Sequence, residues 1–342
     1  MPVNQILTEA IDRVASGIDL SADEAAAVLR EIMSGDASEA QTAAFLIALR
    51  TKGETVQELV GLARTMRELA VRVEVGRDDM LDTAGTGGGR PTFNVSTTAA
   101  FVAAGAGCVV AKHGNRSATG KCGSADVLEA MGAKLDLEPR AVAECIESVG
   151  FGFMFAPHHH QAMRYVIPVR KELGVRTIFN FLGPLTNPAG ATRQLIGVSD
   201  DAYLDTIAAA LGELGGSHGL VVSSADGLDE LSVSGPTHVV ELRDGGIERR
   251  SVEPEEVGVE PFAAELIRSG DPGHNASVTR AVLAGEHGPE RSLTLMNAGA
   301  AVYVAGRADS IADGVKLAAE AIDSGAAIDA LERYVACTQT FG

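Results

Sequence analysis

Apolar and polar positions alternate with the period of α-helices over the first 70 residues. Apolar residues from Ile6 to Val14 recur at helical spacing after Asn4, a residue type that caps helix starts. Gly35 and Gly53 stand where the second and third helices should end, because glycine adopts the left-handed conformation common at helix C-termini. The pattern predicts four short helices.

Three of these helices begin with the sequence of a capping box. Ser21-x-x-Glu24, Ser38-x-x-Gln41 and Thr55-x-x-Glu58 each precede an apolar helical period. In such a box, side chain and backbone satisfy each other's unpaired groups. The apolar faces that follow, with Phe45, Leu46 and Leu49, suit either an interface or simple core packing.

The pattern changes near Met80. The short runs rich in β-branched or other apolar residues are Cys108–Ala111, Phe153–Phe155, Leu195–Val198 and Leu220–Ser223. The helical periods that alternate with them are Ser96–Ala106, Ala125–Met131, Pro139–Val149 and Asp201–Leu214. This alternation predicts an α/β fold, with a mainly parallel central sheet flanked by helices.

Two later segments complete the organisation. Thr237–Val252 predicts a hairpin that turns at 243–246, and the chain beyond Pro254 is helical again. We therefore expect a small helical domain over residues 1–70 and a large α/β domain over 71–342.

Composition narrows the class of protein. With 46% apolar residues the 342-residue chain can bury a sizeable core, and its net charge of −18 disfavours binding to nucleic acid or to anionic membranes. Four scattered cysteines form no CxxC pair, which fits a reducing compartment. The N-terminus has no signal pattern, and the longest apolar run, Ala99–Ala111, is shorter than the roughly 20 residues of a membrane span. We expect a soluble cytoplasmic protein.

The first concentration of chemistry is Asp82-Thr-Ala-Gly-Thr-Gly-Gly-Gly89, between a predicted strand and a predicted helix. Glycines let backbone N–H groups approach a ligand, and a helix N-terminus favours anions, so phosphate is the expected ligand. The alternative is an ordinary tight turn. The spacing fits neither GxGxxG nor a Walker A loop, and Gly114–Lys121 misses Walker A by one residue.

Three further motifs follow the glycine loop. Asn94-Val-Ser-Thr97 opens a predicted helix, where its hydroxyls either cap the helix or bind phosphate or metal. Lys112-His-Gly-Asn-Arg-Ser117 places two cations at the carboxyl end of a strand, which predicts an oligophosphate clamp. Gly123-Ser-Ala-Asp126 offers another helix N-terminus to an anion.

In this order and spacing, these motifs resemble those of the anthranilate phosphoribosyltransferase family. The resemblance continues through Ala156-Pro-His-His-His160, Pro168-Val-Arg170, the segment 176–188 and Gly227-Leu-Asp-Glu230, and covers almost the whole chain. It implies transfer of a 5-phosphoribosyl group from phosphoribosyl pyrophosphate to anthranilate during tryptophan synthesis. It also implies a Mg²⁺ cofactor and a homodimer formed through the helical part.

The resemblance assigns residues to each ligand. Those expected at the phosphoribosyl donor are Gly85, Thr86, Gly87, Gly88, Asn94, Val95, Ser96, Thr97, Lys112, His113, Gly114, Asn115, Arg116, Ser117, Gly120 and Ser124. Those expected at anthranilate are Gly85, His113, Asn115, His160, Arg170 and Gly183. Ser96, Asp229 and Glu230 are expected at the metal, whereas composition alone would make Asp229–Glu230 a solvated acidic pair.

The implied mechanism is dissociative. Magnesium and the cationic residues stabilise departing pyrophosphate, ribose C1 gains oxocarbenium character, and the aromatic amine attacks from the opposite face. An aniline-type amine is unprotonated near neutral pH, so no side chain is assigned as general base. Arg170 is the expected partner of the anthranilate carboxylate.

The glycine loop departs from the family pattern. Gly89 stands where that pattern has Asp, and the loop is one residue shorter. Arg90 then either contributes charge at the site or faces water. The alternatives to this family are a nucleoside phosphorylase-like glycosyltransferase and a non-catalytic relative that binds nucleic acid. A metal site at His158–His160 is disfavoured because adjacent side chains rarely point at one ion.

Overall fold

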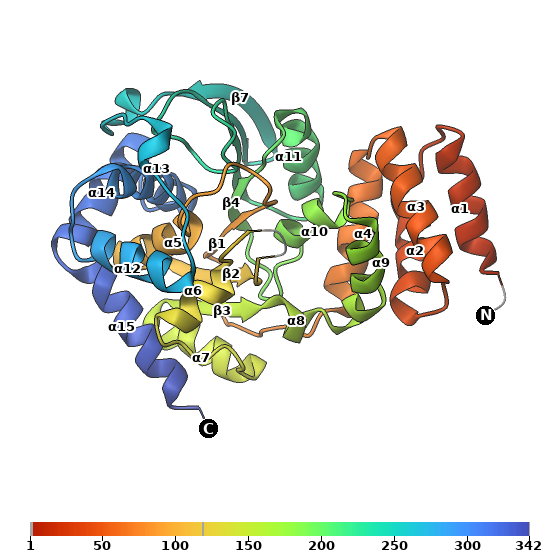
Figure 1. Cartoon of the computed structure of the whole chain (residues 1–342), viewed down its shortest axis with the longest axis horizontal. Helices are drawn as coiled ribbons and strands as arrows, with labels where there is room; N and C mark the ends of the chain where they lie inside the picture. Colours follow the sequence, from red (N-terminus) through yellow and green to blue (C-terminus); the bar gives the residue numbers. More distant parts are fainter. Residues whose placement is uncertain (1–2, 118–119, 342) are drawn as a thin grey trace.

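The computed structural model describes residues 3–117 and 120–341. A small N-terminal group of helices lies beside a large α/β part, and the two chain ends lie far apart (Figure 1). This arrangement confirms the predicted fold class. Among the described residues, none of the helices has the length and apolar character needed to cross a bilayer.

Four helices form the N-terminal group, as the sequence predicts. They are α1 (Gln5–Ala15), α2 (Ala22–Ser34), α3 (Glu39–Lys52) and α4 (Val56–Leu69). Both capping-box bonds are present at Ser21 and at Thr55. The box predicted at Ser38 is incomplete, because Gln41 Oε1 accepts the N–H of Asn4 at 3.2 Å instead of that of Ser38. The Gln41 amide also donates to the Asn4 carbonyl at 2.9 Å, so these bonds tie α3 to the start of α1.

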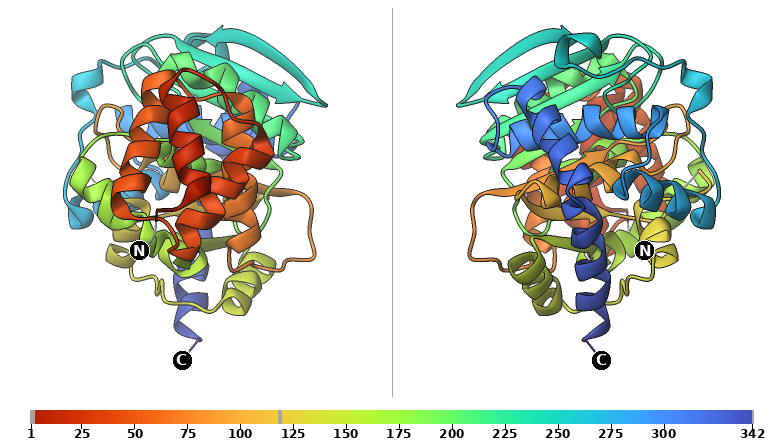
Figure 2. Two further views of the ribbon diagram at one scale, coloured as in Figure 1. Left: turned by 90° about the vertical axis from the view of Figure 1, so that its right-hand side faces the viewer. Right: turned by 90° about the vertical axis from the view of Figure 1, so that its left-hand side faces the viewer.

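Core packing explains the apolar faces of this group. Phe45, Leu46 and Leu49 are no more than 1% exposed within the single chain, so they build its interior rather than an interface. The chain also returns to this group much later. A 3₁₀ turn and two helices pack against the N-terminal helices: η1 (Gln161–Tyr165), α9 (Ile167–Leu173) and α10 (Phe179–Leu185) (Figures 1 and 2). The division at residue 70 remains a prediction.

A seven-stranded sheet organises the large part, in the order β3-β2-β1-β4-β5-β6-β7. The strands are β1 (Met80–Gly85), β2 (Val109–Gly114), β3 (Phe151–Phe155), β4 (Arg193–Gly197), β5 (His218–Ser224), β6 (Thr237–Arg243) and β7 (Gly246–Val252). The first five pair in parallel, and the last two form the predicted antiparallel hairpin. Its turn has positive φ at Asp244 and Gly245, as tight hairpins require.

Helices cover the sheet. They are α5 (Val95–Gly105), α6 (Ser124–Ala130), α7 (Pro139–Val149), α8 (Ala156–His159), α11 (Leu204–Glu213), α12 (Pro272–Leu283), α13 (Pro289–Val304), α14 (Ile311–Asp323) and α15 (Ala326–Gln339). Three short 3₁₀ turns are η2 (Asp201–Tyr203), η3 (Glu255–Val257) and η4 (Ala264–Leu266). The helix predicted over Asp201–Leu214 therefore begins with a 3₁₀ turn, where the Asp200 side chain accepts the N–H of Ala202.

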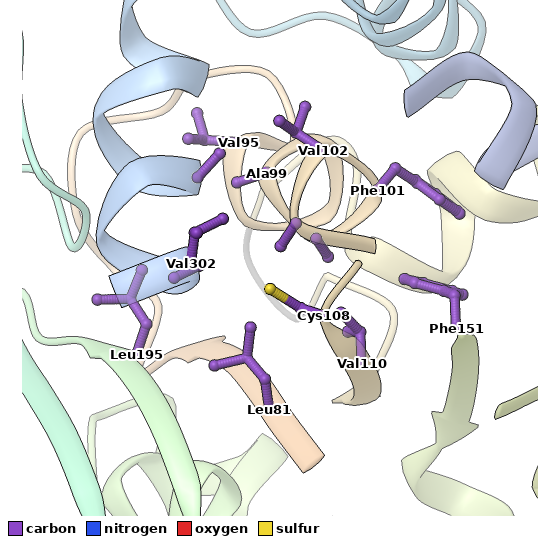
Figure 3. Close-up of a cluster of buried hydrophobic side chains, with 14 of the residues drawn as sticks. Leu81, Val95, Ala99, Phe101, Val102, Cys108, Val110, Phe151, Leu195 and Val302 are labelled. Carbon is purple, nitrogen blue, oxygen red and sulfur yellow. The ribbon is translucent and has the colours of Figure 1, made fainter. Parts of the chain in front are cut away.

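Helix α5 forms the centre of the large core (Figure 3). Its small residues allow close packing on the sheet, and Phe101 stacks on Phe151 with ring centroids 4.2 Å apart. Truncating such a ring costs about 3–5 kcal/mol, because the core cannot fill the gap. The core thus fixes α5, whose N-terminus faces the site described next.

Two cysteines that are distant in sequence meet beside this core. The Cys145 Sγ of α7 lies 3.1 Å from the Cys337 Sγ of α15, and both are thiols. Their spacing along the chain does not predict this contact.

Strand order places the functional edge of the sheet. The chain leaves β1 toward β2 on one side, and later fills the other side with β4 and β5. The loops after β1, β4 and β5 meet at this reversal of direction, where open α/β sheets bind their ligands.

Candidate active site

Two hydrogen bonds to the backbone of Gly87 hold the glycine loop after β1. The N–H of Gly87 donates to Asp229 Oδ2 at 2.9 Å, and the Arg176 guanidinium donates to the Gly87 carbonyl. Gly87 and Gly88 have φ of 69° and 84°, which residues with a side chain adopt only with strain. The loop is exposed to solvent, so its remaining backbone groups are accessible to a ligand.

At Gly85 and Gly89 a side chain would collide with Asp229. A Cβ on Gly85 would stand 2.7 Å from Asp229 Oδ2, and one on Gly89 would stand 2.6 Å from Asp229 Oδ1. The Asp of the family pattern at position 89 therefore does not fit this shorter loop. Arg90 neither faces water nor points at the expected donor site. It forms an ion pair with Asp226 at 3.1 Å, which corrects both expectations for this residue.

Two adjacent carboxylates, Asp229 and Glu230, lie deep at this edge although each keeps some solvent contact. Burial, and then the charge of Asp229, raise the pKa of Glu230 to about 8. Burial also raises the pKa of Asp229, although the N–H of Gly87 and the Arg176 charge oppose the shift. Ser96, at the start of α5, is linked to this pair through Lys112, which contacts the Ser96 hydroxyl and whose charge lowers the pKa of Glu230.

This carboxylate pair suits a hard dication. Two charged oxygen donors side by side, each with its charged form disfavoured, gain stability when a divalent cation neutralises them. The described residues contain no group of three or more His, Cys, Asp or Glu side chains placed for a metal. Magnesium here would take its other ligands from phosphate and water, as it commonly does.

The start of α5 lies beside this pair, but its four predicted site residues differ in role. The Asn94 amide faces away, donating to the Cys122 carbonyl at 3.3 Å and accepting from Asn275 at 2.9 Å. The Val95 and Thr97 side chains are buried, so only their backbone groups can meet a ligand. Ser96 keeps partial exposure, and its hydroxyl is the one that faces the site.

Lys112 is buried beneath Ser96. Its ammonium group donates to Thr83 and reaches the Ser96 hydroxyl at 3.3 Å. Burial lowers the pKa of Lys112, and the charges of Asp82 and Glu230 oppose that shift.

Asp82, for which sequence analysis predicted no role, is fully buried on β1. It accepts from the backbone N–H of His113 at 3.1 Å and from Asn187 at 2.7 Å. It therefore fixes the strand end that carries the Lys112 motif.

The predicted clamp of two cations is not assembled. Whereas Lys112 is buried, Arg116 is half exposed and bonds to Asp126 at 2.8 Å and to Glu129. At the start of α6, Asp126 Oδ2 accepts the N–H groups of Gly123 and Ser117. A carboxylate therefore already lies close to the helix start that was expected to meet an anion.

The remaining predicted residues of this region bond to one another. Ser117 Oγ accepts the Gly120 N–H at 2.7 Å, and the Ser124 hydroxyl donates to the Asn115 carbonyl at 3.2 Å. Thr86 accepts from the Ser199 N–H at 3.4 Å, and Gly114 ends β2 beside Ser124. These contacts hold the loops after β1 and β2 in place.

Three of the residues expected at anthranilate (His113, His160 and Gly183) lie together, and they adjoin the first group through His113 of β2. His113 Nδ1 lies 3.3 Å from the Gly183 carbonyl, and its ring lies 5.1 Å from that of His160. Arg170, on α9, stands over the Phe179 ring at 5.6 Å. The space above Gly183 is open, since a Cβ there would meet nothing within 4 Å.

Polar groups in this second group have few partners. Burial lowers the pKa of Arg170, which forms no ion pair with another described residue. The Nε2 atoms of His113 and His160 are buried without a hydrogen-bond partner in the described protein. Burial, and then the other histidines, keep the pKa of His113 well below its usual range and lower that of His160 to about 4.

The other members of the histidine triplet point elsewhere. His159 Nδ1 bonds to the Val71 carbonyl at 2.8 Å, and His158 lies 3.7 Å from Asp136. Two pockets of about 230 and 190 Å³ also lie away from the site. The first is lined by residues around Asp136 and His158 and the second by residues around Arg193 and Arg243, and neither includes a predicted substrate-binding residue.

Known proteins match this architecture over almost the whole chain. The model of the glycosyl transferase family, helical bundle domain, matches residues 8–70, and that of its a/b domain matches 77–328. The anthranilate phosphoribosyltransferase of Rubrobacter xylanophilus is 54% identical over 332 residues, which is 96% of this chain and 97% of the relative. This chain belongs to the anthranilate phosphoribosyltransferase family.

Solved structures of family members agree. The crystal structure of the Thermus thermophilus enzyme has a TM-score of 0.92 and 46% identity, covering 96% of this chain and 99% of that one. The Saccharomyces cerevisiae enzyme, in complex with phosphoribosyl pyrophosphate and Mg, has a TM-score of 0.90 and 28% identity, covering 98% of each chain.

Within this family framework, sequence analysis missed several residues that hold the site. Asp82, Arg176 and Asn187 lie inside motifs that carried the resemblance, yet no role was predicted for them. The indication available was their position, because a charged or amide side chain beside a predicted buried strand needs a partner. Their partners lie about 90 to 105 positions away in the chain, where local spacing gives no information.

Proposed function

We propose that this chain transfers the 5-phosphoribosyl group of phosphoribosyl pyrophosphate to the amine of anthranilate. The products are N-(5-phosphoribosyl)anthranilate and pyrophosphate, and the step belongs to tryptophan biosynthesis. The observation that supports this most directly is the meeting of the glycine loop, the start of α5 and the pair Asp229–Glu230 at one sheet edge. In addition, the buried Arg170 forms no ion pair with a described residue.

The phosphoribosyl donor is proposed to bind over the glycine loop and the start of α5. Backbone N–H groups at a helix start favour phosphate, and the Ser96 hydroxyl adds a further hydrogen-bonding group. Lys112 supplies positive charge from beneath Ser96 and keeps that hydroxyl oriented. Arg116 would have to leave Asp126 and Glu129 to reach the donor, so its contribution requires an exchange of partners.

Magnesium is proposed to bind at Asp229 and Glu230, with Ser96 nearby. When bound there, the ion would supply positive charge against the departing pyrophosphate. The glycine loop holds Asp229 in place through the N–H of Gly87. This contact fixes one of the two carboxylates before any ligand arrives, which limits the reorganisation needed in the reaction.

Anthranilate is proposed to bind above Gly183, with its carboxylate at Arg170. A guanidinium and a carboxylate match in charge and in planar geometry. His113 and His160 are neutral at physiological pH, so they contribute hydrogen bonding rather than charge. Because His113 adjoins Lys112 on β2, the acceptor amine would stand beside the donor ribose.

In the reaction the bond from ribose C1 to pyrophosphate breaks as the bond from C1 to the anthranilate nitrogen forms. The lone pair of that nitrogen supplies the electrons of the new bond, and pyrophosphate leaves with those of the old one. The proton lost by the amine goes to solvent, and no side chain is assigned as its acceptor. Catalysis then rests on positioning and charge stabilisation.

A fluorescence assay tests the proposal. Anthranilate fluorescence should decline only when protein, phosphoribosyl pyrophosphate and Mg²⁺ are all present. Omitting each component in turn gives the controls. Phosphorolysis of nucleosides, measured in parallel, tests the nucleoside phosphorylase-like alternative. A folded protein that cleaves nucleosides and leaves anthranilate unchanged would overturn the assignment.

Three further expectations concern the domain division, the oligomeric state and the location of the protein. We propose that residues 1–70 form a separate domain that mediates a homodimer, since the apolar Ile6 and Ile18 are 43% and 50% exposed on it. Light scattering should then report twice the 35.3 kDa of one chain. We also propose a cytoplasmic location, because four cysteines that are thiols suit a reducing compartment.

A further inference from the structure

The glycine loop and the acidic turn come from strands that do not touch each other. The loop follows β1, the turn 225–230 follows β5, and β4 lies between the two strands. Something must therefore hold the loop and the turn together across the end of β4. Apart from the Gly87–Asp229 bond, the hydrogen bonds between the loop and the turn in the described structure are made by Arg90.

Arg90 makes three hydrogen bonds to two segments, the acidic turn and η4. Its backbone N–H donates to the Gly227 carbonyl at 2.7 Å, and its Nη2 pairs with Asp226 Oδ2 at 3.1 Å. Its Nη1 donates to the Ala264 carbonyl at 2.9 Å, in η4. The side chain is only 26% exposed, so these bonds are partly shielded from competing water.

Asp226 in turn organises the acidic turn. It accepts from the Ser224 hydroxyl at 2.6 Å and from the Ser232 hydroxyl at 2.9 Å, in addition to Arg90. Burial alone would raise the pKa of Asp226, but these three donors lower it overall. The carboxylate is therefore charged at neutral pH and joins both ends of the segment that carries Asp229 and Glu230.

The glycine loop and the acidic turn are in direct backbone contact at Gly89. A Cβ at Gly89 would lie 2.7 Å from the backbone nitrogen of Asp229 and 2.9 Å from the Gly227 carbonyl, so the two backbones touch directly. A loop that moved by about an ångström would also move the Gly87 N–H away from Asp229, because hydrogen bonds weaken steeply with distance. Arg90 is the cation that closes this contact.

We propose that Arg90 is a positioning residue whose pairing with Asp226 fixes the glycine loop against the Asp229–Glu230 turn and thereby sets affinity for a metal-bound diphosphate donor. The inference rests on the proposed function for the identity of that ligand. Arg90 itself need not touch the donor, because its guanidinium is already engaged by Asp226 and Ala264.

The test combines four variants with two readouts. Arg90→Ala, Arg90→Lys, Asp226→Asn and the double variant Arg90→Ala/Asp226→Asn are compared with wild type. The matched control is Arg140→Ala, because Arg140 is exposed on α7 and forms no ion pair with a described residue. The first readout is the KM of each substrate and kcat. The second is amide hydrogen exchange at residues 86–90 in the absence of metal and ligand.

Arg90→Ala should raise the KM for phosphoribosyl pyrophosphate about tenfold, with the KM for anthranilate changed less than about twofold. Exchange at residues 86–90 should accelerate by at least about tenfold, because the loop loses an anchor. Arg90→Lys should fall between, since it keeps the charge but not the fork that reaches two partners. The double variant should match Arg90→Ala within about twofold, because the two side chains act as a unit.

Unchanged exchange and unchanged donor KM in a folded Arg90→Ala protein would overturn the proposal. So would single effects that simply multiply in the double variant. If wild type fails to consume anthranilate, the proposed function fails, and hydrogen exchange still decides the role of Arg90. If Arg90→Ala does not fold, Arg90→Lys and Asp226→Asn carry the same comparison.

Discussion

The two halves of the site differ in how many of their polar groups already have hydrogen-bond or ion-pair partners within the protein. In the donor half, which comprises the glycine loop, the start of α5 and the loop after β2, most groups have partners within the protein. The N–H and the carbonyl of Gly87 are both hydrogen-bonded, and Arg116 forms ion pairs with two carboxylates. At the start of α6, Asp126 accepts the N–H groups of Gly123 and Ser117. In the acceptor half, the Nε2 atoms of His113 and His160 have no hydrogen-bond partner in the described protein, and Arg170 forms no ion pair with a described residue.

This difference implies two modes of binding. Phosphoribosyl pyrophosphate has to exchange partners that the donor half already has, so its binding energy depends on how that half is organised. Anthranilate only has to fill hydrogen-bonding capacity that is already oriented, which lowers the cost of ordering side chains on binding. Substitutions in the donor half should therefore change both arrangement and chemistry, and those in the acceptor half should change affinity alone.

The sharpest way to break this contrast is to remove the acidic pair. Asp229→Ala/Glu230→Ala should lower kcat/KM by about a thousandfold at saturating Mg²⁺, because both proposed metal ligands are lost. The melting temperature should not fall, since burial raises the pKa of both carboxyls, and the charge of Asp229 raises that of Glu230 further, so that their charged forms are disfavoured.

Initial rates and thermal unfolding measure the two effects of this double variant. Glu332→Ala, an exposed acid on α15, serves as the control. Activity within about threefold of wild type would remove the acidic pair from the donor half.

How far the sequence predicts this site depends on the range of the interactions. The caps at Ser21 and Thr55 and the hairpin turn at 243–246 were predicted correctly, because each depends on residues within a few positions of one another. The Ser38 box was predicted wrongly because Gln41 found a tertiary partner in Asn4, 37 positions away.

Long-range partners explain what the sequence could not predict in the site. The motif 112–117 suggested that Lys112 and Arg116 act together, yet one is buried in β2 and the other lies beyond the strand end. Asp82 with Asn187, and Arg90 with Asp226, are joined only by the strand order β2-β1-β4-β5. The spacing of residues in the sequence therefore did not show which polar side chains would pair, even where the motifs themselves were recognised.

The acceptor half is tested by its one cation. Arg170→Ala should raise the KM for anthranilate about 30-fold, which corresponds to roughly 2 kcal/mol for a charge-assisted bond, and leave the KM for phosphoribosyl pyrophosphate within about twofold. Arg170→Lys should recover part of the loss. Aniline, which lacks the carboxylate, gives the control, because wild type and Arg170→Ala should use it equally poorly. A larger change in donor KM than in anthranilate KM would contradict the division into halves.

The pH dependence of stability tests the donor half without any ligand. Burial raises the pKa of Asp82 from 3.8 to about 6, although Lys112, Asn187 and His113 oppose the shift. A group whose pKa is raised on folding contributes stability below its unfolded value, and loses that contribution as pH rises through its folded value. Between about pH 4 and 6.5 wild type should therefore lose on the order of 2 kcal/mol relative to Asp82→Asn.

Urea unfolding of both proteins across this pH range provides the measurement. The comparison uses the slope of the difference with pH, because the amide introduced by Asp82→Asn also changes hydrogen bonds at every pH. A difference that does not vary with pH would mean that Asp82 has an ordinary pKa in the folded protein.

The smallest expected effect is the most direct test that the acceptor half is preorganised in a neutral form. Burial and the neighbouring histidines lower the pKa of His160 to about 4 and keep that of His113 well below its usual range, so neither ring gains charge between pH 6 and 8. The KM for anthranilate should then vary less than about twofold over that range in steady-state assays.

The same histidine, His160, has an effect on stability. A histidine whose pKa is lowered on folding stabilises the protein above its unfolded pKa near 6.5, and this contribution is lost as pH falls toward about 4. Wild type should accordingly lose stability relative to His160→Gln below about pH 6.5, which shows that the ring is buried and neutral rather than merely uninvolved. A KM that rises with a midpoint near about 6.5 as the solution is acidified would instead show an imidazole titrating freely, and the acceptor half would no longer be distinct from an ordinary solvated surface.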